Sequence, residues 1–134
     1  MKVYFDNAAT TPLDPEVCDE MAKVMKEYFG NPSSTHSYGR QAKALIESSR
    51  KKTAGYFNVS PGEIFFTSGG TEADNMAIRC SVNDLGIKHI ITSRAEHHAI
   101  LHTVEMLEKA GMVTVSYVNL SGNGHIDITH LEEL

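Results

Sequence analysis

The stretch Ile64–Asn75, which reads Ile-Phe-Phe-Thr-Ser-Gly-Gly-Thr-Glu-Ala-Asp-Asn, decides the fold of this chain. It joins an apolar run to the start of an amphipathic segment through two glycines. The glycines allow a sharp turn and the close approach of a ligand, and Thr71 adds a hydroxyl. The first N–H groups of the helix that follows have no partners within it and lie at the positive end of its dipole. The pattern predicts a strand, a turn and a helix whose N-terminus binds a phosphate.

This stretch alone does not identify the ligand. The chain has neither the G-x-x-x-x-G-K-[ST] loop of mononucleotide binders nor the G-x-G-x-x-G pattern of dinucleotide binders. Glycines between a strand and a helix also serve packing alone. A bound phosphate and a purely structural turn both remain open at this point.

Strands and helices alternate from Glu63 onwards. The expected elements are a strand at 64–67, a helix at 71–82, a strand at 89–92, a helix at 97–110 and a strand at 113–118. A β-α-β-α-β order implies parallel strands with right-handed crossovers. Ligands bind such sheets at the C-terminal ends of the strands, and Gly70, Thr71 and His97 all follow strands directly.

The residues before this segment predict an extended arm and two helices. The first helix is expected to begin at Asp14-Pro15, a capping residue and a first-turn proline, and to stop at Gly30-Asn31-Pro32. The second ends near Phe57. We therefore divide the chain into an arm and helix pair at about 1–60 and the β-α-β-α-β segment at 61–134.

Composition agrees with a soluble cytosolic domain rather than a nucleic-acid-binding or membrane protein. The chain has 134 residues, of which 41% are hydrophobic and 22% charged, with a net charge of -5. The acidic balance argues against nucleic acid and anionic membranes, and Arg50-Lys51-Lys52 is predicted as a solvated helix face. No apolar run approaches the roughly 20 residues of a membrane span, and no signal-peptide pattern is present. We expect a cytoplasmic protein.

Cysteines and histidines predict no metal site. Cys18 and Cys80 fall inside expected helices without C-x-x-C spacing, which is typical of small buried hydrophobes. His98 and His102 are four residues apart on one helix face, a spacing that can bind a metal. No third ligand is identified, so we expect none there.

Four motifs follow one another at wide spacing: Tyr4–Pro12, Phe29–His36, Ile64–Asn75 and Ala95–Ala99. Together they resemble cysteine desulfurases, which are pyridoxal-phosphate enzymes of the class V aminotransferase family, from about Val3 to the last residue. The resemblance implies an α/β fold with a three-layer, doubly wound, mostly parallel sheet (PLP-transferase fold type I). This chain would form only the N-terminal part of the large domain.

The same resemblance implies removal of sulfur from L-cysteine, leaving alanine and an enzyme persulfide. The sulfur would pass to a scaffold or carrier protein for iron–sulfur cluster or thionucleoside assembly, and the full-length enzyme would be a homodimer. Selenocysteine lyases share much of this N-terminal pattern, so a lyase-like member of the family remains open.

Residue by residue, the resemblance implies that Gly70 and Thr71 hold the phosphate of pyridoxal 5'-phosphate. It implies that His97 stacks on the pyridine ring and helps to move protons, which makes it the catalytic candidate. Asn7 matches a position on the substrate side of the site. The alternative for His97 is a polar residue that merely begins a helix.

The Schiff-base lysine and the sulfur-accepting cysteine of the family come later than this chain reaches. In addition, Thr129 and Glu132 form a capping-box pattern, which predicts that a helix begins there, and the sequence stops two residues after Glu132. We therefore expect the front part of a longer protein, inactive by itself. The alternatives are a non-catalytic phosphate-binding α/β module and one subunit of a split enzyme.

Overall fold

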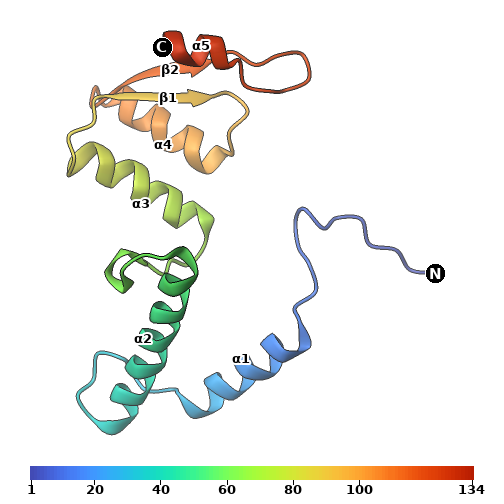
Figure 1. Cartoon of the computed structure of the whole chain (residues 1–134), viewed down its shortest axis with the longest axis vertical. Coiled ribbons are helices and arrows are strands. Elements are labelled where there is room, and N and C mark those ends of the chain that lie inside the picture. Colours follow the sequence, from blue (N-terminus) through green and yellow to red (C-terminus); the bar gives the residue numbers. More distant parts are fainter. The chain divides into compact units, whose positions relative to one another are not determined.

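The computed structural model describes residues 1–134 as five α-helices, one 3-10 helix and a two-stranded sheet (Figure 1). The chain divides into two compact units, Met1–Phe65 and Phe66–Leu134, and each is described by itself. None of the helices combines the length and apolarity that crossing a membrane requires.

Unit 1 consists of an N-terminal arm and helices α1 (Pro15–Glu27), α2 (Ser37–Phe57) and η1 (Pro61–Glu63). The predicted start of α1 is confirmed, since the Asp14 side chain accepts a hydrogen bond from the Glu16 N–H at 2.9 Å. His36 caps α2 by accepting from the Gly39 N–H at 3.3 Å. The predicted end of α2 at Phe57 is also confirmed.

The turn between α1 and α2 requires two glycines because backbones approach closely there. A Cβ on Gly30 would lie 2.4 Å from the Tyr38 carbonyl oxygen, and one on Gly39 would lie 2.4 Å from the Ser34 carbonyl oxygen. Asn31 closes the turn, since its carbonyl accepts from the Ser34 N–H at 2.9 Å. This part of the Phe29–His36 motif therefore has a structural role.

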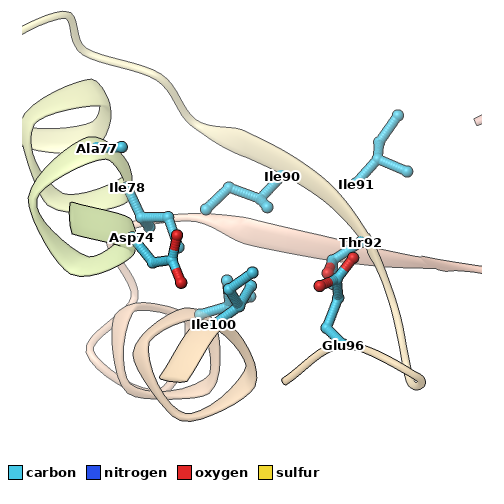
Figure 2. A pocket seen from close by; sticks show the side chains of 9 residues that line it. Asp74, Ala77, Ile78, Ile90, Ile91, Thr92, Glu96 and Ile100 are labelled. Atoms are coloured by element: carbon cyan, nitrogen blue, oxygen red, sulfur yellow. The ribbon is translucent and has the colours of Figure 1, made fainter. Parts of the chain in front are cut away.

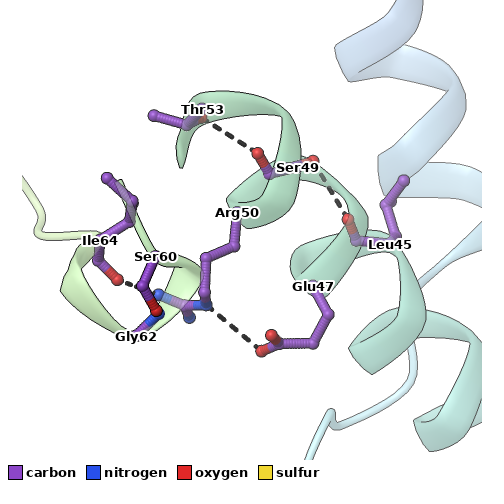
Figure 3. A network of polar contacts seen from close by, with 8 residues as sticks. All are labelled: Leu45, Glu47, Ser49, Arg50, Thr53, Ser60, Gly62 and Ile64. Carbon is purple, nitrogen blue, oxygen red and sulfur yellow. Dashed lines mark hydrogen bonds and ion pairs between the residues drawn. The ribbon is translucent and has the colours of Figure 1, made fainter. Parts of the chain in front are cut away.

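Arg50 is not a purely solvated charge, in contrast to the prediction. Its guanidinium donates to the Ile64 carbonyl, and its Nε lies 3.4 Å from Glu47 Oε1 (Figure 3). The segment after α2 is shaped by a capping box, in which Glu63 Oε2 accepts from the Ser60 N–H at 2.8 Å. Arg50 thus fastens the chain after η1 to α2.

Unit 2 contains α3 (Gly70–Asn83), β1 (His89–Ser93), α4 (His98–Lys109), β2 (Thr114–Val118) and α5 (Ile128–Glu133). The strands are parallel, with His89 opposite Thr114, which confirms the predicted parallel pair. In Figure 1 the strands lie between α4 and α5, and they end on the side where α3 and α4 begin. The core residues are Val82, Leu107 and Val113, with Ile78, Ile90 and Val115 packed against them.

The predicted strand at 64–67 was wrong. These residues form no ladder, because the only sheet is the β1–β2 pair and a strand requires a partner for its backbone groups. Instead, the Ile64 N–H donates to the Pro61 carbonyl at 3.2 Å as the end of η1. Phe65 and Phe66 are 70% and 54% exposed.

The helix predicted near the C-terminus is present, but its predicted cap was wrong. Asp127 caps α5, with Oδ1 accepting from the His130 N–H at 3.1 Å, and Thr129 lies inside the first turn. The Asp127 N–H donates to the Asn119 carbonyl at 2.9 Å. This contact holds Asp127 outside the helix, in the extended conformation that a cap requires.

Both cysteines are exposed, contrary to the expected burial. Cys80 lies on α3 between Ile78 and Val82, which face the core, so its own side chain points elsewhere. A hydrogen bond with the Asp84 side chain raises the pKa of the Cys80 thiol, so it remains protonated at neutral pH.

Candidate functional site

The start of α3 is an open helix N-terminus. No side chain caps it, and its first backbone bond runs from the Ala73 N–H to the Gly69 carbonyl at 3.2 Å. A Cβ placed on Gly69 or Gly70 would meet nothing within 4 Å, so internal packing does not explain these glycines. An uncapped helix start beside open space suits an anion such as a phosphate.

The loop before α3 is braced by Glu72. Its Oε2 accepts from the Ser68 N–H at 2.6 Å and from the Ser68 hydroxyl at 2.7 Å. The hydrogen bond from the Ser68 backbone N–H lowers the pKa of the Glu72 carboxyl most, and the one from the Ser68 hydroxyl lowers it further. The carboxylate is therefore engaged with Ser68, and the brace shapes the turn that leads into Gly70 and Thr71.

The start of α4 is capped by His97. Its Nδ1 accepts from the Ala99 N–H at 3.2 Å, so the neutral ring carries its proton on Nε2. The centroid of the His97 ring lies 3.9 Å from that of His98, and the His98 and His102 centroids are 5.8 Å apart. Capping is the structural alternative that the sequence left open, and the ring-stacking role stays a prediction.

One polar group joins the two helix starts. The Asn75 amide nitrogen donates to the Thr71 carbonyl at 2.8 Å and to the Ala99 carbonyl at 3.4 Å. The Asn75 amide oxygen accepts from the Thr103 hydroxyl at 2.6 Å. Thr71 and the helix start of His97 therefore belong to one hydrogen-bonded cluster in unit 2.

Sequence reasoning missed Asn75 and Thr103 as site residues. Their spacing placed them on helices, four residues after Thr71 and Ala99 respectively. No sequence signal indicated which faces of α3 and α4 meet, because helical period identifies a face but not its partner.

A pocket of about 290 Å³ lies between α3, α4 and the β1 strand (Figure 2). Its walls are mostly aliphatic, with Ile78, Ile90 and Ile100 prominent, and Asp74 and Glu96 supply carboxylates. Figure 2 shows Asp74 on the α3 side and Glu96 beside Thr92. Two carboxylates disfavour an anion, so this pocket does not suit the phosphate.

Asn7 belongs to unit 1, where it is exposed in a turn of the N-terminal arm. The turn is closed by the Ala9 and Thr10 N–H groups, which donate to the Asp6 carbonyl at 3.1 and 3.2 Å. The substrate-side role of Asn7 stays a prediction.

Comparisons with known proteins give a consistent result. The model of the family described as aminotransferase class-V matches residues 3–134. The chain is 46% identical to "Cysteine desulfurase IscS" of Dictyoglomus turgidum, covering 98% of this chain and 34% of that protein. A solved "NifS-like protein" matches with a TM-score of 0.90 and 40% identity, covering 100% of this chain and 37% of the other.

A second solved structure, "SspA in complex with cysteine", matches with a TM-score of 0.83 and 34% identity over 97% of this chain and 38% of the other. The chain spans about a third of the length of the curated relatives it matches.

Proposed function

The chain belongs to the aminotransferase class V family, and we propose that residues 1–134 are the N-terminal part of a pyridoxal-phosphate-dependent cysteine desulfurase. The likeness to the NifS-like protein confirms the expected α/β fold, of which this chain contains the first part. The observation that carries the proposal is the open start of α3, which Asn75 joins to the start of α4.

The residues present fit the phosphate of pyridoxal 5'-phosphate. The backbone N–H groups of Gly70 and Thr71 and the Thr71 hydroxyl would donate to its oxygens, and the helix dipole favours its negative charge. Space in front of Gly69 and Gly70 lets the group approach the backbone. When bound, the cofactor supplies an electron sink for the bond changes at the substrate.

His97 would contribute a ring and a proton. Its Nδ1 accepts from the Ala99 N–H, so Nε2 carries the proton of the neutral ring and can donate it to a bound group, whereas uptake of a proton would occur at Nδ1 and release the Ala99 N–H. The imidazole would lie against the pyridine ring of the cofactor. Donation from Nε2–H is the step that His97 would contribute.

The proposed substrate is L-cysteine. The carbon–sulfur bond would break, the sulfur would pass to a cysteine thiol as a persulfide, and alanine would remain. Support comes from the relative named as a cysteine desulfurase and from the solved SspA complex with cysteine. The sulfur would continue to a scaffold or carrier protein, and Asn7 would lie on the substrate side of a homodimeric enzyme.

The first experiment compares purified residues 1–134 with the full-length gene product. Each is mixed with pyridoxal phosphate and L-cysteine, and alanine is measured. We expect alanine only from a protein that contains the Schiff-base lysine and the sulfur-accepting cysteine of the family. Residues 1–134 alone should therefore be inactive. Alanine formation by residues 1–134 would contradict the inactivity, and a full-length protein that binds no pyridoxal phosphate would contradict the whole proposal.

The same experiment separates the alternatives. L-selenocysteine replaces L-cysteine in a parallel reaction, and a strong preference for it would indicate a lyase-like member. A full-length protein that binds inorganic phosphate as tightly as pyridoxal phosphate would favour the phosphate-binding module. Restoration of activity by a second polypeptide would favour the split enzyme.

A further inference from the structure

We propose that Asn75, held by Thr103, is a positioning residue that fixes the start of α3 relative to the start of α4. It thereby sets Thr71, a phosphate contact, at a defined distance from His97, a ring contact. This inference rests on the proposed function, because it assigns those two roles to Thr71 and His97.

The Asn75 amide is used at both of its ends. Its nitrogen has two protons, and the Thr71 and Ala99 carbonyls accept at 2.8 and 3.4 Å. Its oxygen accepts from Thr103 Oγ1 at 2.6 Å. Because the amide oxygen cannot donate to a carbonyl, a flipped amide would lose these bonds. The side chain is therefore fixed in one orientation.

Thr103 supplies the donor that the Asn75 amide oxygen needs in that orientation. Its hydroxyl has one proton and two acceptors within reach, Asn75 Oδ1 at 2.6 Å and the Ala99 carbonyl at 3.0 Å. When the Thr103 hydroxyl donates to Asn75 Oδ1, the Ala99 carbonyl can accept from the second N–H of the Asn75 amide. The hydroxyl proton, the amide oxygen and both amide protons then each have a partner. Thr103 is only 3% exposed, so water cannot readily replace its hydroxyl.

The cluster leads from one site residue to the other. The Asn75 amide contacts the Thr71 carbonyl, and it also contacts the Ala99 carbonyl. The Ala99 N–H in turn donates to His97 Nδ1 at 3.2 Å. The α3–α4 packing would remain without the amide, but the hydrogen bonds that fix one helix start relative to the other would be lost. Thr71 and His97 can contact the phosphate and the ring of one rigid cofactor at the same time only if the two helix starts are held in place.

Ser81 supplies a matched control on the same helix. Its hydroxyl donates to the Ala77 carbonyl at 2.8 Å, four residues earlier, as the Asn75 amide does to Thr71. Ser81 is half-buried, as Asn75 is, and the hydrogen bond of its hydroxyl stays within α3. Removing it tests the loss of a local bond without the loss of a link between helices.

The test compares Thr103→Val, Thr103→Ser, Asn75→Asp and Ser81→Ala in the full-length protein. The dissociation constants of pyridoxal phosphate and of pyridoxal, which lacks the phosphate, are measured for each. We expect Thr103→Val to weaken pyridoxal phosphate binding about tenfold, or about 1.4 kcal/mol, and pyridoxal binding much less. Thr103→Ser should restore the wild-type ratio, and Ser81→Ala should leave it unchanged.

A second readout needs no cofactor. The imidazole nitrogen signals of His97 are recorded by NMR in the unliganded protein, and Thr103→Val and Asn75→Asp should shift them while Ser81→Ala does not. A lowered melting temperature with unchanged binding ratios and His97 signals would overturn the positioning role. Asn75→Asp keeps the acceptor for Thr103 and removes both donors, so it carries the test if Thr103→Val fails to fold.

The two proposals fail differently. An unsubstituted protein that binds no pyridoxal phosphate would refute the proposed function, and the His97 signals would still report whether Asn75 couples the helix starts. Normal binding with no variant effect would refute the positioning role alone.

Discussion

Thr71 has the only side-chain hydroxyl in the first turn of α3. Thr71→Val keeps the shape and removes this group, so we expect pyridoxal phosphate to bind about 10- to 100-fold more weakly, the value of a hydrogen bond to a charged group. Thr114→Val removes a comparable exposed hydroxyl at the start of β2 and serves as control. Equal affinities of the two variants in equilibrium dialysis would rule out the hydroxyl as a phosphate contact.

His97 caps α4 and is also proposed to contact the cofactor ring, and one substitution can separate these two roles. His97→Asn retains a side-chain acceptor for the start of α4, whereas His97→Ala removes it and should cost about 1 kcal/mol of stability. We expect His97→Asn to melt near the wild-type temperature but to lose desulfurase activity in the full-length enzyme. Full activity of His97→Asn would leave His97 with the capping role alone.

Glu72 makes the loop before α3 sensitive to acid. The bonds from Ser68 lower its folded-state pKa below the unfolded value, so their stabilisation is complete above the unfolded pKa and is lost as pH falls through the folded one. The protection of the Ser68 amide, measured relative to its intrinsic exchange rate at each pH, should therefore fall on acidification, and Glu72→Gln should abolish this pH dependence. An identical pH profile in Glu72→Gln would show that another group controls the loop.

At the scale of elements, Gly39 and Gly55 occupy the same helix in opposite surroundings. A Cβ on Gly39 would lie 2.4 Å from the Ser34 carbonyl oxygen, whereas one on Gly55 meets nothing within 4 Å. Gly39→Ala should destabilise by at least about 1–3 kcal/mol through backbone displacement. Gly55→Ala should stabilise α2 by about 0.5–1 kcal/mol. Denaturant unfolding of both variants checks the opposite signs, and matching signs would contradict this account.

Local signals explain which elements were predictable. Asp14-Pro15 carries both the cap and the first-turn residue of α1, so the sequence was sufficient there. The segment 64–67 has strand-like residues, but a strand depends on a partner that no local pattern reveals. At α5 both Asp127 and Thr129 are capping residue types, and only the distant Asn119 contact selects Asp127.

The candidate site divides in the same way. Gly70, Thr71 and His97 were predicted at helix starts that directly follow strands. The structure has them at helix starts, but only His97 follows a strand, because 64–67 forms none. The Asn75–Thr103 pair was not predicted, because it depends on how α3 and α4 are rotated against each other. Sequence pattern therefore located the ends of the helices, and packing alone showed what joins them.

At the scale of the whole molecule, residues 1–134 leave large apolar side chains exposed. On α1, Val17, Met21 and Met25 are 47%, 49% and 69% exposed and form one face with Val24. The parallel sheet also has only two strands, so each strand keeps one edge without a strand partner. Exposed apolar faces and unpaired strand edges drive association in water.

We therefore expect purified residues 1–134 to associate in a concentration-dependent way in sedimentation experiments. Replacing Met21 and Met25 together by Gln should reduce the association, because it removes apolar area from the α1 face without adding charge. Lys23→Gln, a surface change on the same helix, should leave it unaltered. If the double variant associates as strongly as the parent, the α1 face is not responsible, and the unpaired edges of the β1–β2 sheet become the surfaces to alter next.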